Sequence, residues 1–183
     1  QHTLANYLGR VDFTADRHLS FDLRWAKAGD VEDFRDIDNR AVGALVGFRQ
    51  KHHTLSVGFQ KMSGRDAYPY VTGTDPYLVN FVQILQFSNA GERSWQLRYD
   101  LDLAAWGVPG LSFMSRYVRG DQVQLSSGGE GREWERNSEL TYVIQGGSWK
   151  NASIKWRNAT VRSTFGNDID ETRLVISYPL SLF

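Results

Sequence analysis

The alternation of apolar and polar residues is the feature that most constrains the fold of this chain. Between residues 94 and 103, one set of alternate positions is apolar: Trp95, Leu97, Tyr99, Leu101 and Leu103. The intervening positions are polar or charged: Gln96, Arg98, Asp100 and Asp102. Because successive side chains of a strand point to opposite faces, such a strand has one apolar face and one charged face. The same alternation recurs along the chain, and no long segment keeps the period of 3.6 residues that predicts a helix.

The pattern predicts an all-β protein with about nine strands in one domain, residues 1–183. The expected strands are 4–13, 18–27, 40–50, 54–62, 94–104, 111–119, 138–147, 152–162 and 171–182. Short connections are expected at 14–17, 51–53, 105–110 and 148–151. The other connections are longer, at 28–39, 63–93 and 120–137, with an intermediate one at 163–170.

This alternation of short and long connections is typical of transmembrane antiparallel β-barrels, which have short periplasmic turns and longer extracellular loops. Most of the expected strands also have about the 9 to 11 residues that a tilted membrane strand needs. An odd number of strands cannot close with every neighbouring pair antiparallel, so we expect the nine to belong to a larger barrel. Trp and Tyr near the strand ends fit an interfacial aromatic girdle, although aromatic residues also favour strands in ordinary cores.

Composition excludes several classes of function. Lys plus Arg and Asp plus Glu each number 21, so the net charge is zero and does not favour nucleic acid as a partner. There is no cysteine, and His2, His18, His52 and His53 lack metal-ligand spacing, so neither a metal nor a cofactor is expected. No hydrolase or phosphate-binding motif is present. The sequence therefore predicts that the protein is not an enzyme.

Three segments resemble the OprD-like, substrate-specific porins of pseudomonad outer membranes, the Occ family. These are LSFDLRWAKAG from Leu19, GERSWQLRYDLDLAAWGVPGLSFMSRYVRG from Gly91 and ETRLVISYPLSLF from Glu171. The resemblance covers essentially the whole chain as the carboxyl-terminal half of such a porin. It implies an 18-stranded barrel in the bacterial cell outer membrane that takes up small carboxylate-bearing nutrients passively.

In this family a ladder of basic residues on the inner wall guides the substrate carboxylate, and the matching positions here are Lys155, Arg157 and Arg173. The alternation independently puts these three on the polar face of their strands. Further pore-lining candidates share that face but have no family match: Arg98, Arg116, Arg24, Arg10, Asp100 and Asp102. For the four arginines among them, pairing with nearby acids and contact with substrate are both consistent with the sequence.

The long connection 63–93 is rich in aromatic and β-branched residues, and in the family it folds into the barrel as part of the constriction. The resemblance places a pocket aromatic at Tyr70 and puts Gln86 where the basic-amino-acid branch has an aspartate. Without that anion, plain monocarboxylates are expected. The segment DPYLVNFVQ resembles the branch that takes cyclic and aromatic acids, so a benzoate-like substrate is implied.

The expected partners are a small carboxylate substrate, outer-membrane lipid and lipopolysaccharide, with the protein a monomer or a homotrimer. A soluble β-sandwich or lipocalin-like ligand-binding protein is the alternative. In that alternative, Trp95 and Leu97 would form a core while Arg98 and Asp100 would face water. The sequence therefore leaves one question for the structure: whether the apolar face or the charged face of the sheet lies inside.

Overall fold

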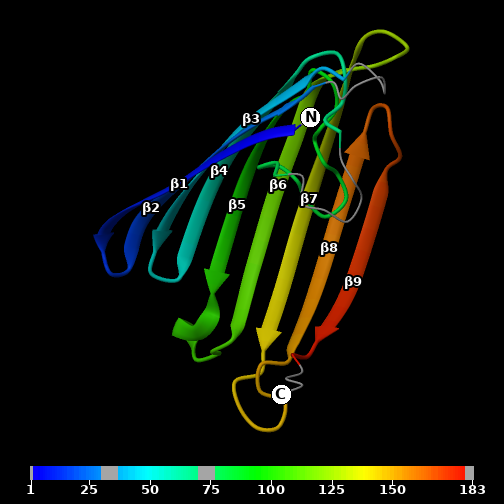
Figure 1. The fold of residues 1–183 in the computed structure, drawn as a ribbon. Helices are drawn as coiled ribbons and strands as arrows, with labels where there is room; N and C mark the ends of the chain where they lie inside the picture. The colour runs from blue at the N-terminus through cyan, green and yellow to red at the C-terminus, as the bar shows by residue number, and fades with distance from the viewer. Residues whose placement is uncertain (1, 30–36, 70–76, 180–183) are drawn as a thin grey trace.

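The computed structural model describes residues 2–29, 37–69 and 77–179, which form a single nine-stranded sheet (Figure 1). The strands follow chain order across the sheet, and each neighbouring pair is antiparallel. They are β1 His2–Thr14, β2 Arg17–Ala28, β3 Asn39–Gln50, β4 His53–Ser63, β5 Arg93–Asp102, β6 Leu111–Gln124, β7 Glu130–Val143, β8 Ser153–Ser163 and β9 Ile169–Ser177. The predicted all-β antiparallel fold and the number of strands are confirmed.

The hairpins at one end of the sheet close through compact connections. The β5–β6 connection contains the short 3-10 helix η1, Leu103–Trp106, where the sequence predicted the end of a strand. Asp102 caps this helix, because its carboxylate accepts a hydrogen bond from the Ala104 N–H at 2.9 Å. Gly107 then ends the helix with φ 82°, a left-handed conformation that glycine adopts without strain.

The predicted long connection at 120–137 is wrong. Strand β6 continues to Gln124 and β7 begins at Glu130, so only residues 125–129 connect them. Two features hide these strand extensions in the sequence. The pairing shifts register between Gly120 and Val123, and the outward positions of β7 include Arg132 and Arg136 in place of apolar residues.

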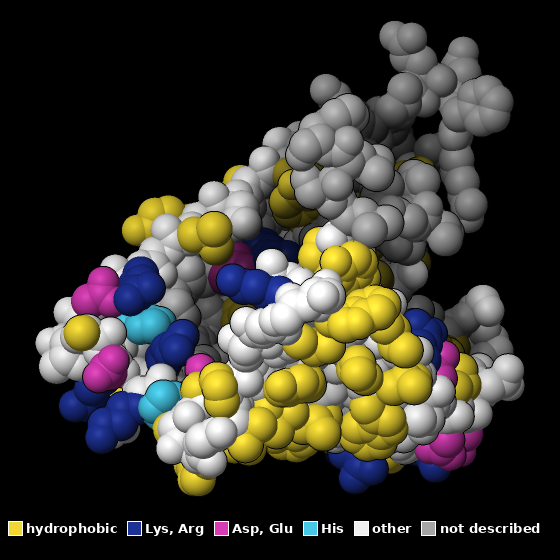
Figure 2. All heavy atoms as spheres, turned by 90° about the horizontal axis from the view of Figure 1, so that it is seen from below, with side chains coloured by type: hydrophobic (Ala, Val, Ile, Leu, Met, Phe, Trp, Pro, Cys, Tyr) yellow, Lys and Arg dark blue, Asp and Glu magenta, His cyan; other side chains and the backbone are white. Residues whose placement is uncertain are grey.

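The polarity of the sheet is the reverse of that in a soluble protein. On β5, Trp95 is 42% exposed and Leu97 45%, whereas Gln96 between them is only 2% exposed. Viewed from the short-turn end, hydrophobic side chains form a patch on one side of the molecule, and charged side chains gather away from this patch (Figure 2). The alternative of a soluble sandwich, with Trp95 and Leu97 as its core, is therefore not favoured.

The connection between β4 and β5 covers the inner, polar face of the sheet, as its described residues show (Figure 1). One part of it contributes Tyr68 and Leu78 to a cluster with the inward side chains of β2 to β4. A second part contributes Val82 and Phe87, which pack on Val118 of β6. The small apolar core of this structure therefore lies between the loop and the wall.

The close approach of loop and wall requires glycine at one position of β3. A Cβ placed on Gly43 would lie 2.6 Å from Val79 of the loop.

Within the three described segments, no helix is long and apolar enough to cross a membrane.

Candidate pore and constriction

Buried polar side chains of the wall hold the loop in place. The Gln60 side-chain amide donates to the Phe87 carbonyl at 2.7 Å and accepts from the Asn80 N–H at 2.9 Å. Glu135 is fully buried, and its carboxylate accepts from the Leu85 N–H at 2.6 Å. Because a buried carboxylate needs hydrogen-bond partners, these contacts fix both the loop backbone and the side chain beneath it.

The loop also reaches the far edge of the described sheet. The Gln83 amide donates to the Glu171 carboxylate of β9 at 2.6 Å, and Arg173 donates to the other oxygen of the same carboxylate at 2.7 Å. Residues 83–85 are therefore held between β7 and β9. This arrangement narrows the space along the inner wall.

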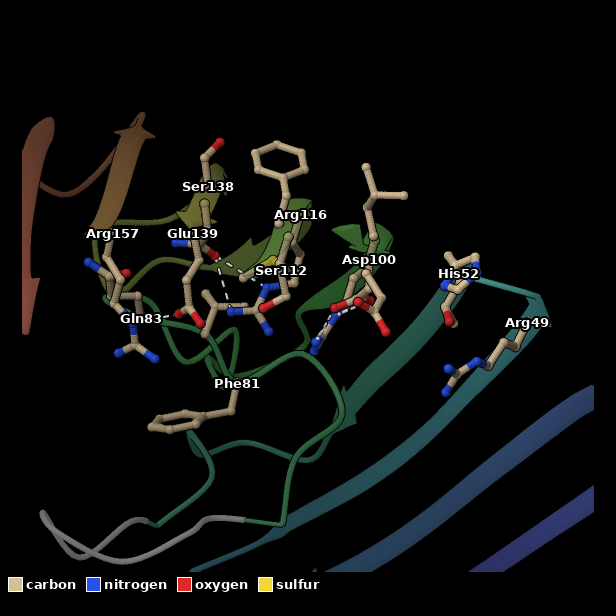
Figure 3. Close-up of a pocket in the computed structure, with 18 residues that line it drawn as sticks. Arg49, His52, Phe81, Gln83, Asp100, Ser112, Arg116, Ser138, Glu139 and Arg157 are labelled. Carbon is tan, nitrogen blue, oxygen red and sulfur yellow. Dashed lines mark hydrogen bonds and ion pairs between the residues drawn. The ribbon is translucent and has the colours of Figure 1, made fainter. Parts of the chain in front are cut away.

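A cavity of about 650 Å³ lies between this loop segment and the inner wall (Figure 3). The loop contributes Phe81, Val82 and Gln83 to its lining, and β3 to β8 contribute the rest together with His52 of the β3–β4 turn. The charged residues of the lining are Arg49, Arg98, Arg116, Arg157, Asp100, Asp102 and Glu139. Most of the surface offered to a solute is therefore polar, with an aromatic ring on the loop side.

Several wall cations are paired with carboxylates. Arg98 donates to both oxygens of Asp100, at 2.6 and 2.8 Å, which is a bidentate arrangement. Lys155 and Arg157 share one carboxylate, since Glu139 lies 3.1 Å from the lysine and 2.6 Å from the arginine. Two positive charges on β8 are thus paired with a single negative charge on β7.

Arg116 differs from these residues because its hydrogen-bond partner is neutral. Its guanidinium donates twice to the Asn137 side-chain oxygen, at 3.3 and 3.2 Å. It also lies directly across from Arg98 in the β5–β6 register. In the described part of the chain, Arg116 forms no ion pair, so its charge remains available to an anion in the cavity.

The remaining predicted site residues that the structure describes do not line this cavity. Arg24 pairs with Asp22 at 2.7 Å, and Arg10 pairs with Asp12 at 2.7 Å in an exposed position. Neither arginine lines the cavity, and neither do Lys155, Arg173 or Gln86. Tyr70 lies outside the described residues.

Sequence reasoning did not single out four residues of this site. Arg49, Phe81, Gln83 and Glu139 all line the cavity. The alternation had placed Arg49 and Glu139 on the polar faces of their strands, but their neighbours depend on strand register. Phe81 and Gln83 belong to a loop that has no periodic pattern.

The base of the loop contains a buried carboxyl group. Burial raises the pKa of Glu92 to about 7, and the nearby Asp121 raises it further, against lowering hydrogen bonds with Asn89 and Glu133. Asn89 also donates to Glu133 at 3.2 Å, so two acidic side chains meet at this amide. Burial likewise raises the pKa of the Tyr68 hydroxyl.

An antiparallel sheet with an apolar outer face, a polar inner face and an inserted loop has the architecture of part of an outer-membrane barrel. The family that matches this sequence is described as "outer membrane porin, OprD family", and the match covers residues 1–182. The chain belongs to the OprD family. Porins are channels and not enzymes, which agrees with the expectation from the sequence.

Two curated relatives support this membership. The chain is 38% identical to "Porin-like protein GalP" of Pseudomonas putida over 86% of its own length and 38% of that protein. It is 33% identical to "Porin D" of Pseudomonas aeruginosa over 94% of its own length and 45% of that protein. The chain therefore spans less than half the length of these relatives.

Solved structures of Pseudomonas aeruginosa porins have the same fold. OccK3 (OpdO) is 54% identical and superposes with a TM-score of 0.93, covering 100% of this chain and 50% of that chain. OpdQ is 44% identical with a TM-score of 0.95, again over 100% of this chain and 50% of that chain. The nine strands thus correspond to half of an OprD-type barrel.

Proposed function

We propose that the complete protein is a passive outer-membrane channel that admits small carboxylate-bearing solutes. The observation that carries this proposal is the charge of the cavity wall. Arg116 has only a neutral partner there, and Arg157 of the lining shares the single carboxylate of Glu139 with Lys155, which lies outside the lining. Positive charge therefore exceeds negative charge where a solute would pass.

The arrangement suits passage better than tight binding. A positive charge at about 4 Å from an anion contributes about 1 kcal/mol in bulk water and several times more at lower effective dielectric. Because the surplus is divided between Arg116 on β6 and the Lys155–Arg157 pair on β8, an anion meets successive moderate sites. Conduction requires binding of this kind, weak enough to allow release.

The substrate class we propose is aromatic or cyclic monocarboxylates, such as benzoate. Phe81 offers a ring to the same cavity that Arg116 and Arg157 line. A guanidinium binds a carboxylate through two parallel hydrogen bonds, and an aromatic ring packs favourably against another ring. Arg173, which is hydrogen-bonded to Glu171, completes the proposed ladder of Lys155, Arg157 and Arg173.

Single-channel recording of the complete porin tests the proposal, with benzoate, arginine and a neutral sugar as competing solutes. Arg116→Gln is expected to reduce benzoate passage and the preference for anions while leaving sugar passage unchanged. Arg10→Gln is the matched control, because it removes one exposed arginine that does not line the cavity. Equal benzoate passage in the two variants would contradict the role of Arg116, and unchanged anion passage in Lys155→Ala, Arg157→Ala and Arg173→Ala would contradict the ladder.

A further inference from the structure

A row of cations crosses the outer face of the sheet near the long-loop end, with one residue on each strand from β2 to β7. We name it the basic belt, and its members are Lys27, Arg40, Lys61, Arg93, Arg119 and Arg132. All six are exposed, and each stands between two buried residues in the sequence. Since side chains alternate along a strand, their side chains point away from the inserted loop, toward the surroundings of the barrel.

An aromatic row runs beside the basic belt on the side of the short turns. It comprises Trp25, Phe59, Trp95, Tyr117 and Trp134, each two residues from a belt member on the same strand. The rings of the last three are in contact, with centroids 5.5 and 5.7 Å apart. Trp and Tyr of membrane proteins concentrate at the level of the lipid headgroups, and two residues of strand span about 6.6 Å. The basic belt therefore lies at or just beyond the headgroup level.

The basic belt is poorly compensated by the protein itself. Arg93 pairs with Asp121 at 3.2 Å, whereas the other five members make no ion pair with any described residue. The register also puts like charges directly opposite each other, Lys27 across from Arg40 and Lys61 across from Arg93. Like charges at such positions repel, and an anion bound between them removes the penalty.

From this geometry we infer that the basic belt binds the phosphate groups of anionic glycolipid in the outer leaflet, that is, the lipid A part of lipopolysaccharide. The inference rests on the placement of the chain in an outer-membrane channel. A lipid headgroup is the ligand that fits, because the belt is continuous with an apolar, aromatic surface suited to acyl chains. A soluble anion would use only the charges.

The test uses the complete porin in detergent and native mass spectrometry to measure bound lipid A. The belt variant combines Lys61→Gln, Arg119→Gln and Arg132→Gln, none of which touches the cavity. The control variant combines Arg17→Gln, Lys51→Gln and Lys150→Gln, which removes three exposed cations at the short-turn end. Because each cation near an anionic surface adds to the attraction, the belt variant is expected to bind bisphosphorylated lipid A at least tenfold more weakly, and the control variant as wild type.

Three outcomes would overturn the inference. One is equal binding of bisphosphorylated lipid A by the two variants, and another is equal binding of dephosphorylated lipid A by the wild type. The third is complete displacement by millimolar inorganic phosphate, which would indicate a small-anion site. Benzoate flux through the belt variant should equal that of wild type. If the porin shows no benzoate flux at all, the proposed function is contradicted, but the inference about lipid A is still decided by the binding measurement.

Discussion

Gln83 donates a 2.6 Å hydrogen bond to Glu171, which joins the middle of the β4–β5 loop to strand β9 at a separation of 88 residues in the chain. The acceptor is a carboxylate, so the bond is charge-assisted. It is the contact that ties the loop across the lumen to the far edge of the described sheet. We therefore expect the width of the constriction to depend on this bond.

Replacing Gln83 with leucine should therefore widen the pore. Gln83→Leu keeps a side chain of similar size but removes the donor, so the loop loses its bond to β9 while its contacts with β4, β6 and β7 remain. Single-channel conductance of the complete porin should rise, with more frequent transitions between levels. Gln86→Leu is the control, because Gln86 lies in the same loop and does not line the cavity. Identical conductance in Gln83→Leu and wild type would show that the bond does not set the constriction.

The loop should be less firmly anchored at alkaline pH. The pKa of Glu92 is raised to about 7 by burial, so between pH 4.5 and 7 the folded loop binds more protons at this carboxyl than an opened loop does. Stability of the closed loop consequently falls as pH rises through this window and is constant for this group below it. Hydrogen exchange of loop amides should be faster at pH 8 than at pH 5 after correction for the intrinsic rate.

Glu92→Gln should weaken this pH dependence, because the amide stays neutral throughout. The control is Glu130→Gln, which removes an exposed carboxylate at the start of β7 and should keep the wild-type profile. A pH dependence as strong in Glu92→Gln as in wild type would assign the effect to another group.

The carboxylate of Glu139 should limit the attraction of the pore for anions. Glu139→Gln leaves Lys155 and Arg157 without a negative partner, so the wall gains one positive charge. The ratio of anion to cation permeability should increase, and the increase should shrink at high salt because exposed charges are screened. Reversal potentials in a salt gradient measure this ratio. No change relative to Glu130→Gln would mean that Glu139 does not face the permeating ions.

Arginine should be tolerated on one face of the sheet and not on the other. Leu97→Arg places a charge on the outer face, which costs about 2–4 kcal/mol near the middle of a bilayer and less near its surfaces. Thr54→Arg introduces the same side chain on the cavity wall and should fold normally. The folded fraction is measured by heat-modifiable migration on gels after refolding into vesicles. Equal folding of the two variants would contradict the assignment of the faces.

The strands were predictable because their outward residues are apolar over most of their length. That signal fails at the β6–β7 hairpin, where outward residues such as Arg132 and Arg136 are charged. The alternation there resembles that of a polar connection, and the irregular pairing near Gln122 breaks its phase. The long connection was therefore predicted wrongly at the place where the strands lack an apolar outer face.

The inner wall was predictable residue by residue, but its charge balance was not. The sequence places Lys155 and Arg157 on the polar face, yet only the register of β7 against β8 brings Glu139 between them. The same holds for Arg116, which lies directly across from the neutral Asn137 and forms no ion pair with Glu135 or Glu139 on either side of it. The residues on the neighbouring strands, and not the neighbours in the sequence, decide which cation has a carboxylate as its partner.

The contacts that hold the constriction also bear on the order in which the protein folds. The loop segment around Gln83 is fixed by Glu135, about 50 residues later, and by Glu171, 88 residues later. Because contacts between distant residues form only after the intervening chain is ordered, the wall must be assembled before the loop can settle. We expect newly inserted barrels to pass through a wide, unselective stage that narrows as the loop docks, and time-resolved efflux of a sugar from vesicles during insertion should detect it.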